Sequence, residues 1–172
     1  MLVSSEKKTE RGVTWILPVF SALALVLLTQ LQYRIAFLEN SFPFLSLIAV
    51  YYWSIYKPRL MPVMAVFILG LLQDILSGGP LGLMSLLLLL TRLFVVQQGS
   101  RFLEKEFLFN WLVFIVVSVL FGLSLWAISS LYLRDLQNIW TVLSQGALTI
   151  AIYPIVAWGL DRLRSLLVTD NR

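Results

Sequence analysis

Two charged side chains lie in the most apolar part of this chain, and their types could support chemistry. Asp74 stands one turn before the turn formed by Gly78, Gly79 and Pro80, and Arg92 lies ten residues after Gly82. Charged groups at membrane depth often line the pathways of ions and substrates, so an acid and an arginine could form a transport site. The same two side chains could instead stabilise the packing of helices. The elements around them decide between these interpretations.

The composition indicates a membrane protein made of helices. Of the 172 residues, 59% are hydrophobic and 13% are charged, and the mean hydropathy is +0.88. Soluble domains average about 45–50% apolar and about 25% charged residues. We therefore predict an all-α, polytopic membrane protein with a single domain over residues 1–172.

The residue types that are absent exclude several classes of chemistry. The chain has no cysteine and no histidine, which rules out disulfides, thiolate metal sites and catalysis by imidazole. The lysines stand only in predicted loops and tails, so a buried lysine base is not expected. We predict no enzymatic activity and no cofactor. The cationic residues are scattered between apolar runs, so the sequence also predicts no nucleic-acid binding.

Hydropathy predicts six transmembrane helices, with short tails at residues 1–12 and 161–172. The second predicted segment has an alternative as a re-entrant helix, because its 14 residues rise only about 21 Å. Aromatic residues at the end of that segment, from Tyr51 to Tyr56, are expected to form an interfacial belt. Pro154 is expected to kink the last helix. The predicted spans are residues 13–31, 43–56, 61–77, 81–98, 107–133 and 139–160.

The distribution of positive charge predicts the orientation of the chain. Ten Lys and Arg residues flank one side of the predicted spans, two flank the other side, and Arg92 lies within a span. Loops rich in Lys and Arg stay in the cytosol, so both termini are expected there, as an even number of spans requires.

Asp74 has two interpretations in this topology. Gly70, Asp74 and Gly78 follow one another at intervals of four residues, so they share one helix face that could pack closely against another helix. In that case the carboxylate would find a donor on the neighbouring helix. Alternatively, Asp74 lies only about 6 Å from the turn and is hydrated at the outer interface.

Arg92 requires a partner more clearly than Asp74 does. It lies roughly 15 Å into the fourth predicted span, where a charge costs at least about 2.5–3.5 kcal/mol. It needs a partner, a polar cavity or a route along which its side chain can reach the headgroups. We expect a polar network between Asp74 and Arg92 that stabilises the structure, since buried ion networks are not by themselves evidence of activity.

The central third of the sequence resembles a known family. The run P43-F-L-S-L-I-A-V-Y-Y-W53, the basic K57-P-R59, and the hairpin G70-L-L-Q-D74-I-L-S-G78-G-P80-L-G82 resemble the rod shape-determining protein MreD family. Within that resemblance, the hairpin motif falls on Gly70, Asp74, Gly78 and Gly82. Gly79 and Pro80 complete the turn, and Arg92 has no place in the family pattern. We take all seven as candidate structural or partner-binding residues.

The resemblance implies a location and partners. It implies a multi-pass protein of the bacterial inner membrane, surrounded by membrane lipid, whose fold is similar to the substrate-binding subunits of vitamin transporters. It also implies an MreC-type bitopic scaffold as a partner. Through that scaffold, an MreB-type actin homologue and the glycosyltransferase and transpeptidase of wall synthesis would be indirect partners.

Two functions from different classes follow. The first is a non-catalytic scaffold of the cell-wall elongation complex, needed for rod shape. The alternative is a small-solute-binding membrane subunit of a vitamin-type transporter. Such subunits often carry an Ala-x-x-x-Ala stripe on the first helix, whereas here Ala22 is followed by Val26. The scaffold is favoured, and homo-oligomerisation stays open.

Overall fold

The structure, a computed structural model, describes residues 17–29, 42–98, 107–133 and 138–169, with side chains up to Ser165. Within these ranges the chain is helical and contains no strand, which confirms the all-α prediction. The described ranges contain six α-helices and one short 3-10 helix (η2): Leu17–Thr29, α2 Leu45–Tyr56, η2 Pro58–Leu60, α3 Val63–Ser77, α4 Leu83–Gln97, α6 Phe107–Leu133 and α7 Ile139–Thr169.

The observed helices follow the predicted spans closely, except that α7 is longer than predicted. α6 has the predicted bounds, and α3 and α4 each begin two residues later than their spans. α7 contains Pro154 and continues past the predicted end at Leu160 to Thr169. The predictions for residues 1–12 and for the first loop fall outside the described residues.

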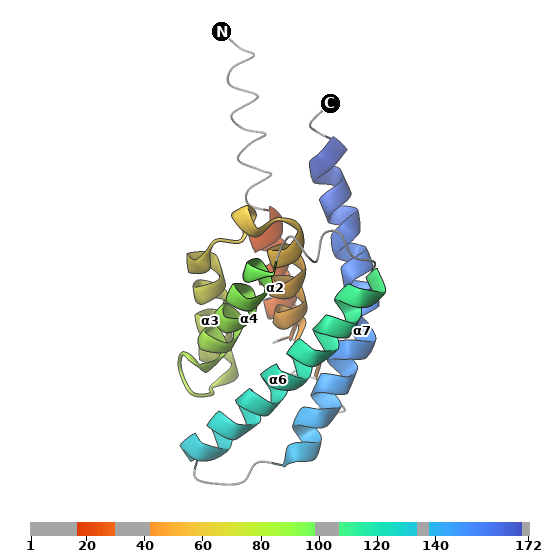
Figure 1. The fold of residues 1–172 in the computed structure, drawn as a ribbon. Helices are drawn as coiled ribbons and strands as arrows, with labels where there is room; N and C mark the ends of the chain where they lie inside the picture. Colours follow the sequence, from red (N-terminus) through yellow and green to blue (C-terminus); the bar gives the residue numbers. More distant parts are fainter. Residues whose placement is uncertain (1–16, 30–41, 99–106, 134–137, 170–172) are drawn as a thin grey trace.

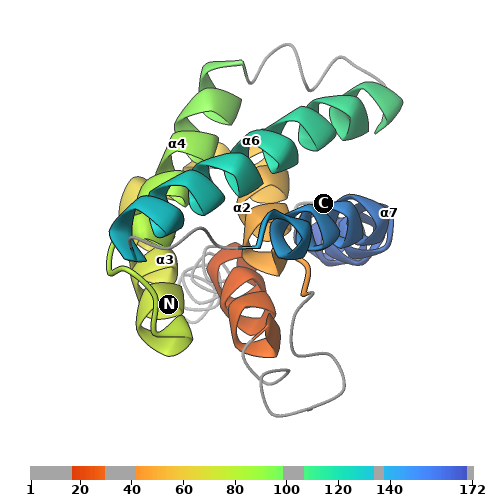
Figure 2. The same cartoon turned by 90° about the horizontal axis from the view of Figure 1, so that it is seen from below.

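The helices form a bundle in which α3 and α4 are an antiparallel hairpin (Figure 1). The turn of this hairpin, the last turn of α6 and the first turn of α7 lie toward one end of the bundle. The end of α2, η2 and the last turn of α7 lie toward the other end. α6 crosses obliquely over α4, as the view along the bundle shows (Figure 2).

α2 is the central helix of the bundle. Every residue from Leu45 to Ile55 is buried, which fits a helix that is apolar on all sides. Its start is held by α7, because the backbone N–H of Phe44 donates to Thr149 Oγ1 at 2.8 Å. Its far end is held by the helix Leu17–Thr29, since Trp53 Nε1 donates to Ser21 Oγ at 2.9 Å.

The predicted interfacial belt at the end of α2 is therefore wrong for three of its four aromatic residues. Tyr51, Tyr52 and Trp53 are at most 2% exposed and lie in the core. The Tyr51 hydroxyl donates to the carbonyl oxygen of Asn110 on α6 at 2.8 Å, and its ring meets the Phe114 ring edge-on. Because neighbouring helices surround α2, its polar aromatic atoms find partners in the protein rather than among headgroups.

The outer faces of the long helices are apolar. Leu108, Leu112, Val116 and Leu120 follow at intervals of four residues along α6, and each is more than half exposed. Two helical segments, Phe107–Leu133 and Ile139–Ser165, are long and apolar enough to cross a membrane. Soluble monomers rarely expose continuous apolar surface on this scale, so this surface fits lipid contact.

Candidate functional site

Asp74 joins the two helices of the α3–α4 hairpin. Asp74 is 2% exposed, and its carboxylate caps the first turn of α4. Asp74 Oδ2 accepts the backbone N–H of Gly82 at 2.9 Å, and Oδ1 accepts that of Met84 at 3.0 Å. The N–H of Ser85 lies 3.5 Å from Oδ2, a longer contact. The first N–H groups of a helix lack partners within the helix and carry partial positive charge, so a carboxylate there satisfies both.

Gly70 allows α3 and α4 to approach closely. A Cβ atom at Gly70 would lie 2.4 Å from Ser85 Cα and 2.7 Å from Ser85 N. A hydrogen bond also joins the two helices at this close approach, since Ser85 Oγ donates to the carbonyl oxygen of Phe67 at 3.2 Å. The predicted close packing of the small-residue face is present at Gly70, whereas a Cβ at Gly78 would meet nothing within 4 Å. Asp74 is buried on this face and finds its donors on the neighbouring helix α4.

The other glycines of the motif shape the turn. Gly78 ends α3 with φ of 66°, and its N–H donates to the carbonyl oxygen of Asp74 at 3.1 Å. Gly82 precedes α4 with φ of 92°. Both are left-handed conformations that L side chains rarely adopt. Pro80 contributes a carbonyl oxygen that accepts the N–H of Leu83 at 3.2 Å, and Gly79 completes the turn between them.

Arg92 is bound elsewhere, at the opposite end of α3. Its Nε donates to the backbone carbonyl oxygen of Met61 at 2.7 Å, just before α3 begins. Asp74 takes its hydrogen bonds from the start of α4, so the expected polar network between Asp74 and Arg92 is absent from this structure. The physical reason is that α3 and α4 are antiparallel. This places Arg92 beside the start of α3 and away from Asp74 near its end, so the long arginine side chain binds the helix end nearest to it.

The separate partners predict that substitutions of the two residues act independently. Asp74→Ala and Arg92→Ala should each lower the free energy of unfolding, Arg92→Ala by about 1–2 kcal/mol because it leaves the Met61 carbonyl without its donor. Since the two side chains share no partner, the double variant should lose the sum within about 0.5 kcal/mol. Thermal unfolding of all four proteins in one detergent measures this. A double variant that loses clearly less than the sum would show that Asp74 and Arg92 interact after all.

A cavity adjoins Asp74 at the turn end of the bundle. It has a volume of about 340 Å³ and lies between the α3–α4 turn and the facing ends of α6 and α7. The sequence did not single out its polar residues as a group, because they come from three separate helices. A signal that could have found them is that they stand near the helix ends on one side of the predicted membrane: the C-terminal ends of α3 and α6 and the N-terminal end of α7. These residues are Asp74, Ser77, Trp126, Ser129, Asn138 and Thr141.

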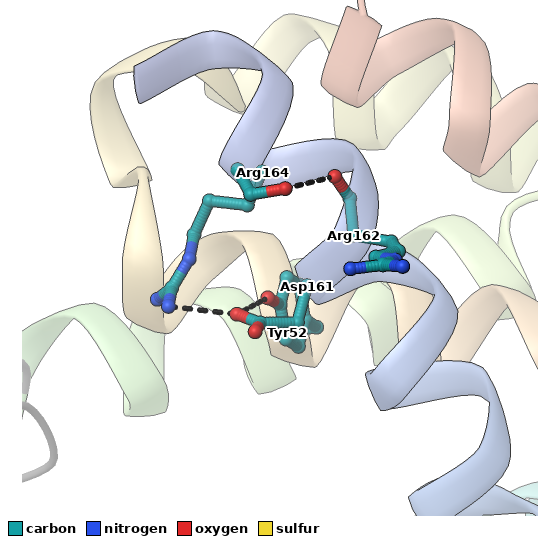
Figure 3. Close-up of polar contacts among 5 residues, drawn as sticks. Tyr52, Asp161, Arg162 and Arg164 are labelled. Atoms are coloured by element: carbon teal, nitrogen blue, oxygen red, sulfur yellow. Dashed lines mark hydrogen bonds and ion pairs between the residues drawn. The ribbon is translucent and has the colours of Figure 1, made fainter. Parts of the chain in front are cut away.

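A second polar cluster lies at the opposite end, where α2 meets α7 (Figure 3). The Tyr52 hydroxyl donates to Asp161 Oδ1 at 3.0 Å, and Arg164 Nη2 lies 2.7 Å from the same oxygen. The Arg164 guanidinium also lies 4.3 Å from the centre of the Tyr56 ring. Asp161 and Arg164 are partly exposed, so their ion pair contributes about 0–1 kcal/mol and mainly orients the end of α7.

Neither cluster resembles a metal site or a catalytic set. Across the described residues, no group of three or more His, Cys, Asp or Glu side chains could hold a metal ion. Asp74 and Asp161 lie at opposite ends of the bundle and have no second acid beside them in the contacts described above.

Comparison with known proteins gives the family. Residues 9–161 match the family model described as rod shape-determining protein MreD. The chain belongs to the MreD family. MreD proteins are membrane proteins, and membership implies a role in determining rod shape. An uncharacterized protein of Rickettsia prowazekii (strain Madrid E) is 27% identical to this MreD chain over 165 residues, which cover 94% of each protein. No solved structure matches the chain.

Proposed function

We propose that this chain is a non-catalytic scaffold of the cell-wall elongation complex in the bacterial inner membrane. Six segments cross the membrane in this proposal, and both termini lie in the cytosol. The direct partner is an MreC-type bitopic scaffold. An MreB-type actin homologue and the wall-synthesis glycosyltransferase and transpeptidase are reached through it. The transporter alternative receives no support from the comparisons.

The observation that carries this proposal is the family match over residues 9–161, together with the use that the hairpin makes of its charges. The Asp74 carboxylate binds the start of α4, and the Arg92 guanidinium binds the Met61 carbonyl oxygen. Both charged side chains therefore connect helices of the same chain. This favours a packed membrane scaffold over a charged transport pathway.

The position of the basic residues supports the proposed orientation. Lys57 and Arg59 stand at η2, and Arg162 and Arg164 stand near the end of α7, which are toward the same end of the bundle (Figure 1). The α3–α4 turn at the other end, residues 77–83, contains no Lys or Arg. Positive charge concentrated at one end marks the cytosolic side.

Depletion in the native rod-shaped bacterium tests the proposed function. Loss of the protein should make the cells round or wide, and a plasmid copy carrying Gly159→Ala should restore rods, because nothing lies within 4 Å of a Cβ at that position. A photo-crosslinker at Ile75, which is 61% exposed on the helix that carries Asp74, should capture a membrane partner. Normal rod shape after complete depletion would contradict the proposal.

A further inference from the structure

The cavity beside the hairpin turn has an unusual charge distribution. Among the residues that line it, Asp74 is the only charged one, and no Lys or Arg is present. Hydroxyl and amide groups of Ser77, Ser129, Asn138 and Thr141 supply neutral polar atoms. Such a lining disfavours an anion and accepts a neutral or cationic group.

The Asp74 carboxylate is only partly neutralised by the protein. It is 2% exposed, and within the described ranges it forms no ion pair with a Lys or Arg side chain. Its compensation comes from the N-terminus of α4, which carries roughly half an elementary charge. Oδ1 accepts one hydrogen bond, from Met84 N, whereas a carboxylate oxygen offers about two acceptor positions. Oδ1 therefore keeps an acceptor position for a further donor, and a cationic donor would complete the compensation of the charge.

The size and walls of the cavity favour an organic cation. Its volume of about 340 Å³ corresponds to roughly eleven water molecules at about 30 Å³ each. A bare Ca²⁺ ion is usually held by six to eight oxygen ligands that include several carboxylates, whereas this lining supplies a single carboxylate. A primary ammonium group has three donors, which the carboxylate and neighbouring hydroxyl oxygens can accept.

An apolar pocket lies beside this cavity. This pocket of about 820 Å³ is lined mainly by Phe67, Leu81, Leu86, Leu89, Ile128 and Tyr132. The two share the lining residues Gly79, Pro80 and Leu83. A ligand with a polar ammonium head and an apolar tail matches this pair of compartments.

We propose that the cavity binds a primary ammonium group, supplied by the ethanolamine headgroup of a membrane phospholipid, with Asp74 as its counter-ion. The phosphate of that lipid stays outside the cavity, because the lining holds no Lys or Arg to pair with it. The acyl chain lies in the adjoining apolar pocket. This role is separate from the binding of a scaffold partner, so it can fail while the proposed function holds.

Lipid retention by the purified full-length protein tests this inference. The protein is extracted from mixed vesicles of phosphatidylethanolamine and phosphatidylglycerol with identical acyl chains, and bound lipid is counted by native mass spectrometry. A charge-assisted hydrogen bond predicts about a tenfold preference for the ethanolamine lipid. Phosphatidylcholine, whose quaternary ammonium has no N–H, should lose most of that preference.

Two tryptophan substitutions on the same helix locate the site. Ser129→Trp points a large side chain into the cavity and should abolish the preference, whereas Leu131→Trp, at a position that is 81% exposed, should keep it. Equal retention of the two lipids by the unmodified protein overturns the proposal, even if a variant fails to fold. A preference that survives in a folded Ser129→Trp protein also overturns it. If millimolar free ethanolamine displaced the lipid completely, the ligand would be a soluble amine, and the proposal that a phospholipid supplies the ammonium group would be overturned.

Discussion

Replacing Asp74 with alanine is expected to lower the free energy of unfolding by about 3 kcal/mol, the largest loss among the charged residues that the structure describes. The substitution removes two short charge-assisted hydrogen bonds, to the N–H groups of Gly82 and Met84. It also leaves those partly buried N–H groups without acceptors. Thermal unfolding in a single detergent, followed by size-exclusion chromatography, measures the loss.

Two further variants separate the cap from general effects of charge. Asp74→Asn keeps one acceptor oxygen and should lose less than Asp74→Ala. Asp161→Ala removes an acid that is 55% exposed, together with the acceptor of the Tyr52 hydroxyl, and should cost about 1–2 kcal/mol, less than Asp74→Ala. If Asp74→Ala were as stable as Asp161→Ala, the carboxylate would not be the cap of α4.

Gly70→Ala is expected to cost about 2–3 kcal/mol, because the new methyl group would meet backbone rather than a flexible side chain. The nearest atom is Ser85 Cα at 2.4 Å, so α3 and α4 would have to move apart. The hydrogen bond from Ser85 Oγ to the Phe67 carbonyl oxygen would lengthen with them. The same thermal assay measures the loss, and cell shape in a complementation strain reports its effect on function.

Matched glycines on α7 provide the control. A Cβ at Gly146 or Gly159 would meet nothing within 4 Å. Alanine is favoured over glycine in a helix by about 0.5–1 kcal/mol, so Gly146→Ala and Gly159→Ala should be neutral or stabilising. Gly70→Ala behaving like these two would show that the hairpin is not packed as tightly as described.

These effects explain what the family motif does in this chain. Gly70 allows the helices to touch, Asp74 caps α4, and Gly78 and Gly82 adopt left-handed conformations on either side of the turn. Each motif residue therefore has a role in building one hairpin. The acid that could have served as a transport site is a structural cap, and it is also one of the residues that line a cavity.

Much of the fold and part of the site could be predicted from the sequence alone. Apolar runs of sufficient length, broken by Gly and Pro, determined the helices and the position of the α3–α4 turn, because a backbone in lipid must satisfy its own hydrogen bonds. The four-residue spacing of Gly70, Asp74 and Gly78 placed them on one face by helical geometry alone. The same residues carried the resemblance to the MreD family.

Only the tertiary structure decided which apolar surfaces face protein and which face lipid. Lipid tails and leucine side chains are about equally apolar, so hydropathy cannot distinguish a central helix from a peripheral one. For this reason Tyr51 and Trp53 were expected at the interface and lie in the core, and Arg92 binds the Met61 carbonyl oxygen instead of Asp74. The cavity beside Asp74 likewise depends on three helix ends meeting, which no single stretch of sequence encodes.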